Sequence, residues 1–494
     1  MIRIQDINKK LHGTAVDSLL LTFVKVITSV FGLLVTKIIS TQFTLQQYGT
    51  YSQGMLIVST ATSITILGLT DATNYFYNAR EDEKKKKNNV CTIFGMQYCL
   101  GIFAAVVIML LSIPIIKYFD NAQLKGVIYV VAWMPLTQNL LSMLQVLFVS
   151  IGKAKILAVR NFLLSIARLV ITFIGCIIAN DVFSIFVMLL LLDIVQIVYF
   201  YTYFSKTEFY INLKCLKTEL VPDILKFCIP MAIYVMTNAL VRDIDKYVIG
   251  YFGDTETLAI YTNAAKILPF DLLTASFLTV LIPIVTRQIR SARYKEAQNT
   301  FRAYLRVGYL MTWMFVSGAM IVAKELMKFL YDEKYLLGLP VFVIYLGVDM
   351  TRFANMSLIL TAKGKTKILM YCSIISLLAN GIFNVITFKI WGITGPALTT
   401  LIITIFLTVA LISLDAREIE TEVWKLFDWK EIGIMLVEMI VFGMLTYFLK
   451  NILYSISNNY VIVLILDYGI YLGIICLLNY KRLINCLREI NRLR

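Results

Sequence analysis

The chain has 494 residues, of which 59% are hydrophobic and only 16% are charged, and its mean hydropathy is +0.77. This balance excludes a water-soluble globular protein, whose surface needs more charge. The net charge of +15 would suit nucleic acid only if the basic residues gathered on one soluble face. They lie instead between long apolar segments, so we expect membrane lipids and no nucleic acid as partners.

Fourteen apolar segments are long enough to cross a bilayer, which takes about 20 residues in a helix. Charged residues, Pro and Gly mark their ends. The sequence therefore predicts an all-α integral membrane protein with about fourteen transmembrane helices. In chain order the predicted spans are 15–39, 51–77, 91–114, 127–150, 156–179, 182–204, 227–250, 258–286, 303–323, 338–361, 367–388, 394–415, 431–449 and 460–479.

The distribution of Lys and Arg supports this order of spans. With a cytoplasmic N-terminus, 31 of the 46 basic residues lie on the cytoplasmic side, 7 lie outside and 8 lie within spans. Enrichment of Lys and Arg in cytoplasmic loops sets the orientation of membrane proteins. We therefore expect a multi-pass protein with cytoplasmic N- and C-termini.

Two predicted cytoplasmic loops carry nearly the same string, 212 positions apart. Gly152-Lys-Ala-Lys-Ile-Leu157 follows the fourth span, and Gly364-Lys-Thr-Lys-Ile-Leu369 follows the tenth. A repeat of six spans returns the second copy in the same orientation, and the substrate path of such transporters lies between the halves. The predicted organisation is an N-terminal six-helix bundle (1–204), a cytoplasmic linker (205–226), a parallel C-terminal six-helix bundle (227–415), and two extra helices with a basic cytoplasmic tail (416–494).

Charged residues within the predicted spans are the candidate site residues. A charge at the bilayer centre costs about 2.5–3.5 kcal/mol on insertion scales, so it faces protein or a water-filled cavity. Guanidinium and ammonium groups in such a cavity suit an anionic substrate, because they donate several hydrogen bonds to phosphate oxygens. The predicted substrate-binding residues are Lys25, Arg168, Arg242, Lys266 and Arg352. The acidic candidates for ion coupling or charge pairing are Asp71, Asp193, Asp243, Asp245, Asp271 and Asp349.

Some of these charges have a simpler interpretation. The pairs Asp349 with Arg352, Arg242 with Asp245, and Asp243 with Lys246 are each three residues apart and can neutralise each other on one helix face. Lys37 and Arg160 lie near span ends, where long basic side chains extend to the membrane interface.

No cofactor and no metal site are predicted, because the eight cysteines form no CxxC or clustered pattern. Asp193 and Asp271 are alternatively candidates to bind or relay a coupling proton or sodium ion.

Eight motifs lie within residues 10–415. They are Gln46-Gln-Tyr-Gly-Thr-Tyr51, Gly68-Leu-Thr-Asp-Ala-Thr-Asn-Tyr-Phe76, Phe227-Cys-Ile-Pro-Met231, Asp245-Lys-Tyr-Val-Ile-Gly250, Leu330-Tyr-Asp-Glu-Lys-Tyr335, Gly364-Lys-Thr-Lys367, Asn380 with Asn384, and Trp391-Gly-Ile-Thr-Gly-Pro-Ala-Leu398. In this order and spacing they make the chain similar to the multidrug/oligosaccharidyl-lipid/polysaccharide exporter superfamily. The resemblance is strongest to its polysaccharide repeat-unit flippases of the O-antigen or capsule type. Among the candidate residues, the matching motifs include Asp71 and Asp245.

The resemblance implies two six-helix bundles in a V, in a bacterial cytoplasmic (inner) membrane. It implies alternating access that moves a polyprenyl-pyrophosphate-linked oligosaccharide to the outer leaflet. A polysaccharide polymerase and the chain-length machinery are the implied protein partners.

Three other functions compete with this one. A lipid II flippase has the same number of spans and a cationic cavity, and the sequence separates it poorly from a repeat-unit flippase. A drug or cation exporter is expected to have an acidic cavity, which the eight basic residues within spans argue against. A membrane glycan-modifying enzyme needs catalytic side chains on a sizeable loop, and the predicted outer loops are short. The chain also has no GxxxxGK[ST] or HExxH motif, so we expect a transporter and not an enzyme.

Overall fold

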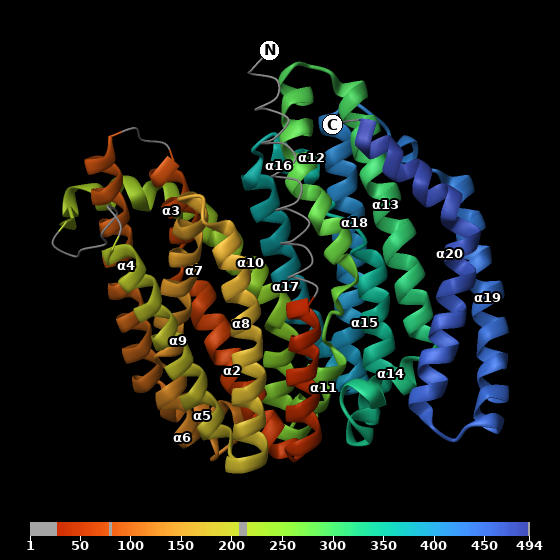
Figure 1. Ribbon diagram of the computed structural model, residues 1–494, viewed down its shortest axis with the longest axis horizontal. Coiled ribbons are helices and arrows are strands. Elements are labelled where there is room, and N and C mark those ends of the chain that lie inside the picture. Colours follow the sequence, from red (N-terminus) through yellow and green to blue (C-terminus); the bar gives the residue numbers. More distant parts are fainter. Residues whose placement is uncertain (1–26, 79–81, 207–214, 493–494) are drawn as a thin grey trace. The chain divides into compact units, whose positions relative to one another are not determined.

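The computed structural model describes residues 27–78, 82–206 and 215–492, and within these ranges all regular secondary structure is helical (Figure 1). Two compact units share the chain. The first comprises Met1–Asp243 and Gly250–Ala259, and the second comprises Ile244–Ile249 and Ile260–Arg494.

The described part of the first unit contains ten α-helices, one short π-helix (η1) and one short 3₁₀-helix (η3), besides the beginning of α11. They are the helix Ile27–Gln42, α2 (Leu45–Thr65), α3 (Leu69–Asn78), α4 (Glu83–Leu110), α5 (Ser112–Phe119), α6 (Leu124–Val131), α7 (Met134–Ser150), α8 (Ala154–Phe173), η1 (Ile174–Ala179), α9 (Val182–Ser205), η3 (Thr218–Leu220) and most of α10 (Val221–Phe252).

Helix α7 forms the core of the first unit. It packs against α2, α3, α4 and α9, and its apolar side chains, such as Leu140, Leu144 and Phe148, are almost completely buried. A helix with neighbours on most sides has apolar residues around much of its circumference. The polar side chains of α7 are therefore exceptions to this pattern, and several of them line the cavity described below.

The second unit continues from α11 (Thr255–Ala264) to the C-terminus. Its remaining elements are η4 (Pro269–Asp271), α12 (Leu272–Arg290), α13 (Tyr294–Ile321), α14 (Ala323–Leu330), η5 (Glu333–Gly338), α15 (Leu339–Thr351), α16 (Leu358–Ala362), α17 (Thr366–Trp391), α18 (Thr394–Glu418), η6 (Val423–Leu426), α19 (Trp429–Ile456) and α20 (Tyr460–Arg492).

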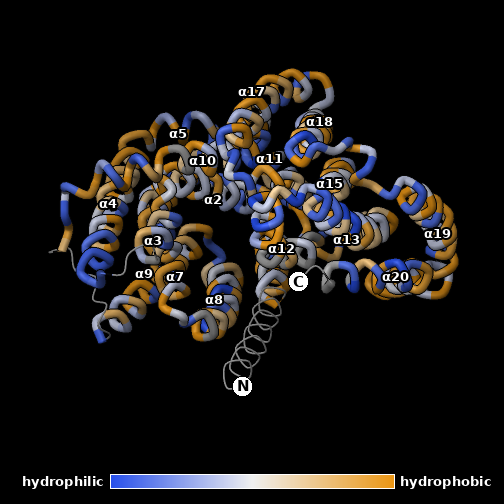
Figure 2. Tube along the Cα trace, turned by 90° about the horizontal axis from the view of Figure 1, so that it is seen from above, coloured by the Kyte–Doolittle hydropathy of each residue, from blue (hydrophilic) through white to orange (hydrophobic). Residues whose placement is uncertain are grey.

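Helix α13 is the centre of the second unit and packs against α12, α15, α19 and α20. Two glycines allow this close approach. A Cβ atom on Gly308 would lie 2.7 Å from the Phe353 carbonyl oxygen, and one on Gly318 would lie 2.7 Å from the Tyr468 ring. Small residues let helix backbones approach in membranes, where packing replaces the hydrophobic drive. Helices α19 and α20 lie side by side at the edge of this unit (Figure 2).

The all-helical membrane fold agrees with the sequence-based expectation. Nine helices of the described residues are long and apolar enough to cross a membrane, or up to twelve when three bent pairs are each taken as one span. Each of the fourteen predicted intervals overlaps a helix or a broken pair of helices. The number fourteen itself stays a prediction.

Several predicted spans are broken in the structure, and at two of these breaks buried aspartates accept hydrogen bonds from the freed backbone groups. Between α11 and α12, the Leu268 N–H donates to Asp349 Oδ2 at 3.2 Å. Between α15 and α16, Ile359 N–H and Leu360 N–H donate to Asp415 at 2.9 and 3.0 Å. Backbone groups released at membrane depth need such internal partners.

The two loops of the sequence repeat adopt the same turn. Gly152 has φ +79° and Gly364 has φ +69°. In the first turn, Gly152 N–H donates to the Val149 carbonyl and Lys153 N–H donates to the Phe148 carbonyl. In the second turn, Gly364 N–H donates to the Thr361 carbonyl and Lys365 N–H donates to the Leu360 carbonyl. Both patterns are Schellman motifs, which end a helix with a left-handed glycine. The repeated string therefore encodes a repeated local structure.

A polar cavity as the candidate functional site

A cavity of about 510 Å³ lies within the first unit, among α2, α7, α8, α9 and the helix Ile27–Gln42. Its wall mixes apolar groups with hydroxyl, amide and charged groups. The lining residues are Thr28, Phe31, Gly32, Val35, Tyr51, Met55, Met134, Gln138, Leu141, Ser142, Gln145, Leu164, Ser165, Arg168, Thr172, Leu189, Asp193 and Gln196. A cavity of this size with a few convergent polar groups is the usual form of a small-molecule site.

Arg168 and Asp193 bring opposite charges to this cavity. Arg168 on α8 is exposed, whereas Asp193 on α9 is 4% exposed and accepts a hydrogen bond from Thr137 Oγ1 at 3.2 Å. Among the described residues, no group accepts a hydrogen bond from the guanidinium of Arg168. Its five N–H donors are therefore available to an anionic ligand in the cavity.

A chain of hydrogen bonds links Asp193 through Gln196 to Arg160. Gln196 Nε2 donates to Asp193 Oδ1 at 3.4 Å, and Gln196 Oε1 accepts from Arg160 Nη2. The Arg160 guanidinium also lies 5.0 Å from the centre of the Phe200 ring. Arg160 therefore points into the helix bundle, and our expectation that it extends to the membrane interface is wrong, because an amide and an aromatic face inside the unit receive it.

Sequence reasoning missed the uncharged half of this site. Gln138, Ser142 and Gln145 on α7 all line the cavity. Their spacing of four and three residues places them on one face of a helix. A search for polar residues at helical spacing inside the span 127–150 could have found them.

The other candidate residues of the first unit lie outside this cavity, and Lys25 lies outside the described residues. Asp71 is exposed on α3, and Arg242 is exposed on α10. Asp243 is 6% exposed and accepts a hydrogen bond from Ser59 Oγ at 3.1 Å. Of the charges predicted in this unit, the structure thus brings Arg168 and Asp193 together.

The second unit holds a carboxylate between two tyrosines. Asp245 is 2% exposed, and its Oδ2 accepts from the Tyr261 hydroxyl at 2.7 Å and from the Tyr345 hydroxyl. Such hydrogen bonds stabilise a buried carboxylate. Asp245 therefore joins α10 to α11 and α15.

Three further candidates lie at helix breaks of the second unit. Lys266 is half-buried just before η4, and Arg352 ends α15. Asp271 belongs to η4, and its side chain lies outside the described residues. Asp349 accepts a hydrogen bond from Leu268 N–H at the break between α11 and α12. The predicted charges of the second unit therefore lie near positions where its helices are interrupted.

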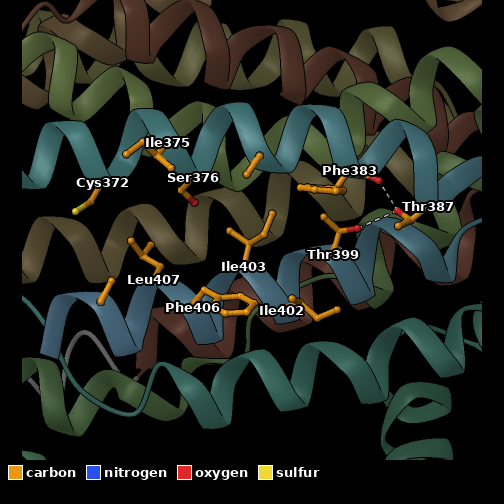
Figure 3. A pocket seen from close by; sticks show the side chains of 12 residues that line it. Cys372, Ile375, Ser376, Phe383, Thr387, Thr399, Ile402, Ile403, Phe406 and Leu407 are labelled. Atoms are coloured by element: carbon orange, nitrogen blue, oxygen red, sulfur yellow. Dashed lines mark hydrogen bonds between the residues drawn. The ribbon is translucent and has the colours of Figure 1, made fainter. Parts of the chain in front are cut away.

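An apolar groove of about 560 Å³ lies between α17 and α18 (Figure 3). Ile375 and Phe406 on its wall are 67% and 71% exposed. A hydrogen bond of 2.9 Å between the hydroxyls of Thr387 and Thr399 closes one end. The lining residues are Cys372, Ile375, Ser376, Ala379, Phe383, Thr387, Thr399, Ile402, Ile403, Phe406, Leu407 and Ala410. Such a surface suits a hydrocarbon chain.

The fold matches solved structures of flippases and transporters. The lipid II flippase MurJ in an inward closed conformation matches with a TM-score of 0.74 at 15% identity, over 94% of this chain and 100% of that one. An inward-facing multidrug resistance MATE family transporter of the MOP superfamily matches with a TM-score of 0.66 at 13% identity, over 80% of this chain and 94% of that one. A MOP superfamily transporter from Pyrococcus furiosus Vc1 (DSM3638), described by the reverse polarity of its binding pocket, matches with a TM-score of 0.60 at 14% identity. The match covers 82% of this chain and 94% of that one. The chain therefore has the fold of a MOP superfamily transporter.

The sequence matches the polysaccharide biosynthesis protein family over residues 25–340, and the chain belongs to this family. No curated protein matches the chain in sequence. Family and fold together identify a multi-pass membrane protein of a polysaccharide biosynthesis family that has a transporter fold.

Proposed function

We propose that the chain is a flippase that moves a polyprenyl-pyrophosphate-linked oligosaccharide from the cytoplasmic to the outer leaflet by alternating access, for surface polysaccharide assembly. The observation that carries this proposal is Arg168 in a cavity whose other polar groups are mostly hydroxyls and amides. A guanidinium binds pyrophosphate oxygens through paired hydrogen bonds. Hydroxyl and amide groups both donate and accept, as sugar hydroxyls require.

The lipid part of such a substrate needs an apolar path. The groove of α17 and α18 supports this requirement, because its lining is almost entirely apolar and side chains on its wall, such as Ile375 and Phe406, are exposed. A hydrocarbon tail that lies in this groove stays in apolar surroundings and out of water. The tail can therefore remain on a lipid-like surface while the head group is handled elsewhere.

The remaining predicted features belong to the same proposal. Lys25, Arg242, Lys266 and Arg352 are further candidate substrate contacts, in two parallel bundles joined by the linker 205–226. Asp193 is the first candidate for proton or sodium coupling, because it is buried beside the cavity. The proposed location is the bacterial inner membrane, with both termini cytoplasmic and the polysaccharide polymerase as a partner.

A lipid II flippase is the nearest alternative, and the likeness to the MurJ fold favours it over a drug exporter. Deletion of the gene distinguishes these functions. For a repeat-unit flippase, lipid-linked repeat units accumulate on the cytoplasmic face and surface polymer is lost. Loss of cell-wall synthesis with intact surface polymer would assign lipid II instead, and unchanged levels of both would contradict the proposal.

The cavity is tested with Arg168→Gln in proteoliposomes that contain a labelled polyprenyl-pyrophosphate oligosaccharide. A charge-assisted hydrogen bond contributes about 1.5–3 kcal/mol, so we expect a loss of roughly 10- to 100-fold in flipping. Arg168→Lys should retain more activity, because it keeps the charge but not the paired donors. The matched control is Arg293→Gln, an exposed arginine paired with Glu296 at 3.6 Å. Equal flipping by both glutamine variants would remove Arg168 from the site.

A further inference from the structure

Asp467 is a completely buried carboxylate whose oxygens receive no hydrogen bond. It lies on α20, is 0% exposed, and neither Oδ1 nor Oδ2 has a partner among the described residues. An ionised carboxylate in this setting costs several kcal/mol, whereas binding a proton or a cation removes the cost. Asp467 therefore requires a ligand or a compensating charge.

The charged neighbours of Asp467 come from two other helices. Glu325 on α14 is 4% exposed and accepts from Lys450 Nζ at 3.3 Å and from the Tyr454 hydroxyl at 2.8 Å. Lys450 and Tyr454 belong to α19. In the part of the chain that the structure describes, these three side chains are the ionisable groups that interact electrostatically with Asp467.

Lys450 is already engaged by other groups. Its ammonium also donates to the Ile321 carbonyl at 3.0 Å. That carbonyl is the last of α13, where the chain bends by 87° into α14. A lysine at a helix C-terminus is a favourable partner for such a released carbonyl. Lys450 thus holds the α13–α14 corner and pairs with Glu325.

The charges of this cluster leave one carboxylate without compensation. The cluster contains one ammonium, on Lys450, and two carboxyl groups, on Glu325 and Asp467. When both acids are ionised, the buried cluster carries one net negative charge, and one proton on Asp467 makes it neutral. One bound proton balances these charges, so a proton is the ligand that the charge count favours.

We propose that Asp467, beside Glu325 and Lys450, is a proton-binding site of the α19–α20 helix pair. This site belongs to the second unit, whereas the Arg168 cavity belongs to the first. It is a property of the protein alone and holds whatever substrate is carried.

Infrared difference spectroscopy tests the site on the purified full-length protein in lipid nanodiscs. We expect a protonated carboxyl band at mildly acidic pH that disappears as the pH is raised and is absent from Asp467→Asn. Glu438→Gln is the matched control, because this carboxylate of α19 is already partnered by Asn479 at 2.9 Å and Arg482 at 3.1 Å. Its spectrum should keep the band. A band that is absent from the wild type, or unchanged in Asp467→Asn, would overturn the proposal.

A second variant keeps the test decisive if Asp467→Asn does not fold. Glu325→Gln leaves Lys450 and Asp467 as one positive and one negative group, so the carboxyl band should disappear at a lower pH than in the wild type. A band at an unchanged pH would contradict the charge count. Loss of the band on adding sodium chloride, but not potassium chloride, would assign the site to sodium and overturn the proton assignment.

Discussion

Asp415 shows how much one buried side chain stabilises this fold. It is completely buried on α18 and accepts hydrogen bonds from two backbone N–H groups of α16, those of Ile359 and Leu360. Asp415→Ala leaves both donors unsatisfied, and each costs about 1–3 kcal/mol. We therefore expect a clear fall in the thermal unfolding midpoint of the detergent-purified protein. Asp415→Asn should lose less, because the amide oxygen still accepts.

The control for this prediction is Ser413→Ala on the same helix. Ser413 is half-buried, and its hydroxyl donates to the Val409 carbonyl within α18. That carbonyl belongs to the same helix, so removal of the hydroxyl should leave the midpoint nearly unchanged. If Asp415→Ala unfolds at the same temperature as Ser413→Ala, Asp415 does not hold the α15–α16 break.

At the residue scale, the sequence identifies buried charges but not their roles. Asp349 and Asp193 are both intramembrane aspartates in the sequence, yet one accepts from a backbone N–H at a helix break and the other borders a cavity. The difference depends on where the helices break and which helix lies opposite. Asp467, in the last predicted span, is not among the predicted site residues, and only the structure shows that it is buried without a hydrogen-bond partner among the described residues.

At the element scale, the two Schellman turns give a prediction that needs no tertiary contact. A Cβ atom at Gly152 or Gly364 would have no heavy atom within 4 Å, so only the positive φ opposes a side chain. An L-residue in this conformation costs about 1–2 kcal/mol. Gly152→Ala and Gly364→Ala should each destabilise the protein by about this amount, measured by denaturant unfolding in detergent, and the corresponding Asn variants should lose less.

Gly433→Ala is the matched control for these glycines. A Cβ atom at Gly433 would also have no heavy atom within 4 Å, but this residue lies inside α19 without a positive φ. Alanine favours a helix interior, so this variant should be neutral or slightly more stable. Equal destabilisation of all three variants would mean that the turns are not held by their backbone conformation.

The positions of the helices follow from the sequence much better than their interruptions. Apolar length predicts one helix over 258–286, whereas the structure ends α11 at Ala264 and starts α12 at Leu272. Apolar length does not reveal that Asp349, from a distant segment of the chain, accepts a hydrogen bond from the freed Leu268 N–H. Breaks of this kind depend on tertiary partners, which hydropathy does not report.

At the scale of the whole molecule, the sequence predicts the class of fold but not the cavity that the packed helices form. Apolar segments and the resemblance of the motifs anticipate a helical transporter fold, and the match to MOP superfamily structures agrees with this. The helix packing that creates the Arg168 cavity brings together residues from five helices, up to 168 positions apart in the chain. Only the tertiary structure makes those residues neighbours.

Membrane orientation is the property of the whole chain that the charge distribution predicts most directly. With 31 of 46 basic residues on one side and 7 on the other, Lys153 and Lys425 should be cytoplasmic and Lys125 external. All three are exposed. In a background without the eight native cysteines, single Cys variants at these positions are treated with a membrane-impermeant maleimide in intact spheroplasts.

We expect Lys125→Cys to be labelled in intact cells, and Lys153→Cys and Lys425→Cys only after permeabilisation. The physical reason is that Lys and Arg near span ends are retained on the cytoplasmic side during insertion. Reversed labelling of all three would invert the topology. Labelling of Lys153→Cys and Lys425→Cys on opposite sides would require an odd number of membrane crossings between them, whereas the predicted order has eight. This one experiment therefore tests both the orientation of the chain and whether the number of spans from 156 to 415 is even.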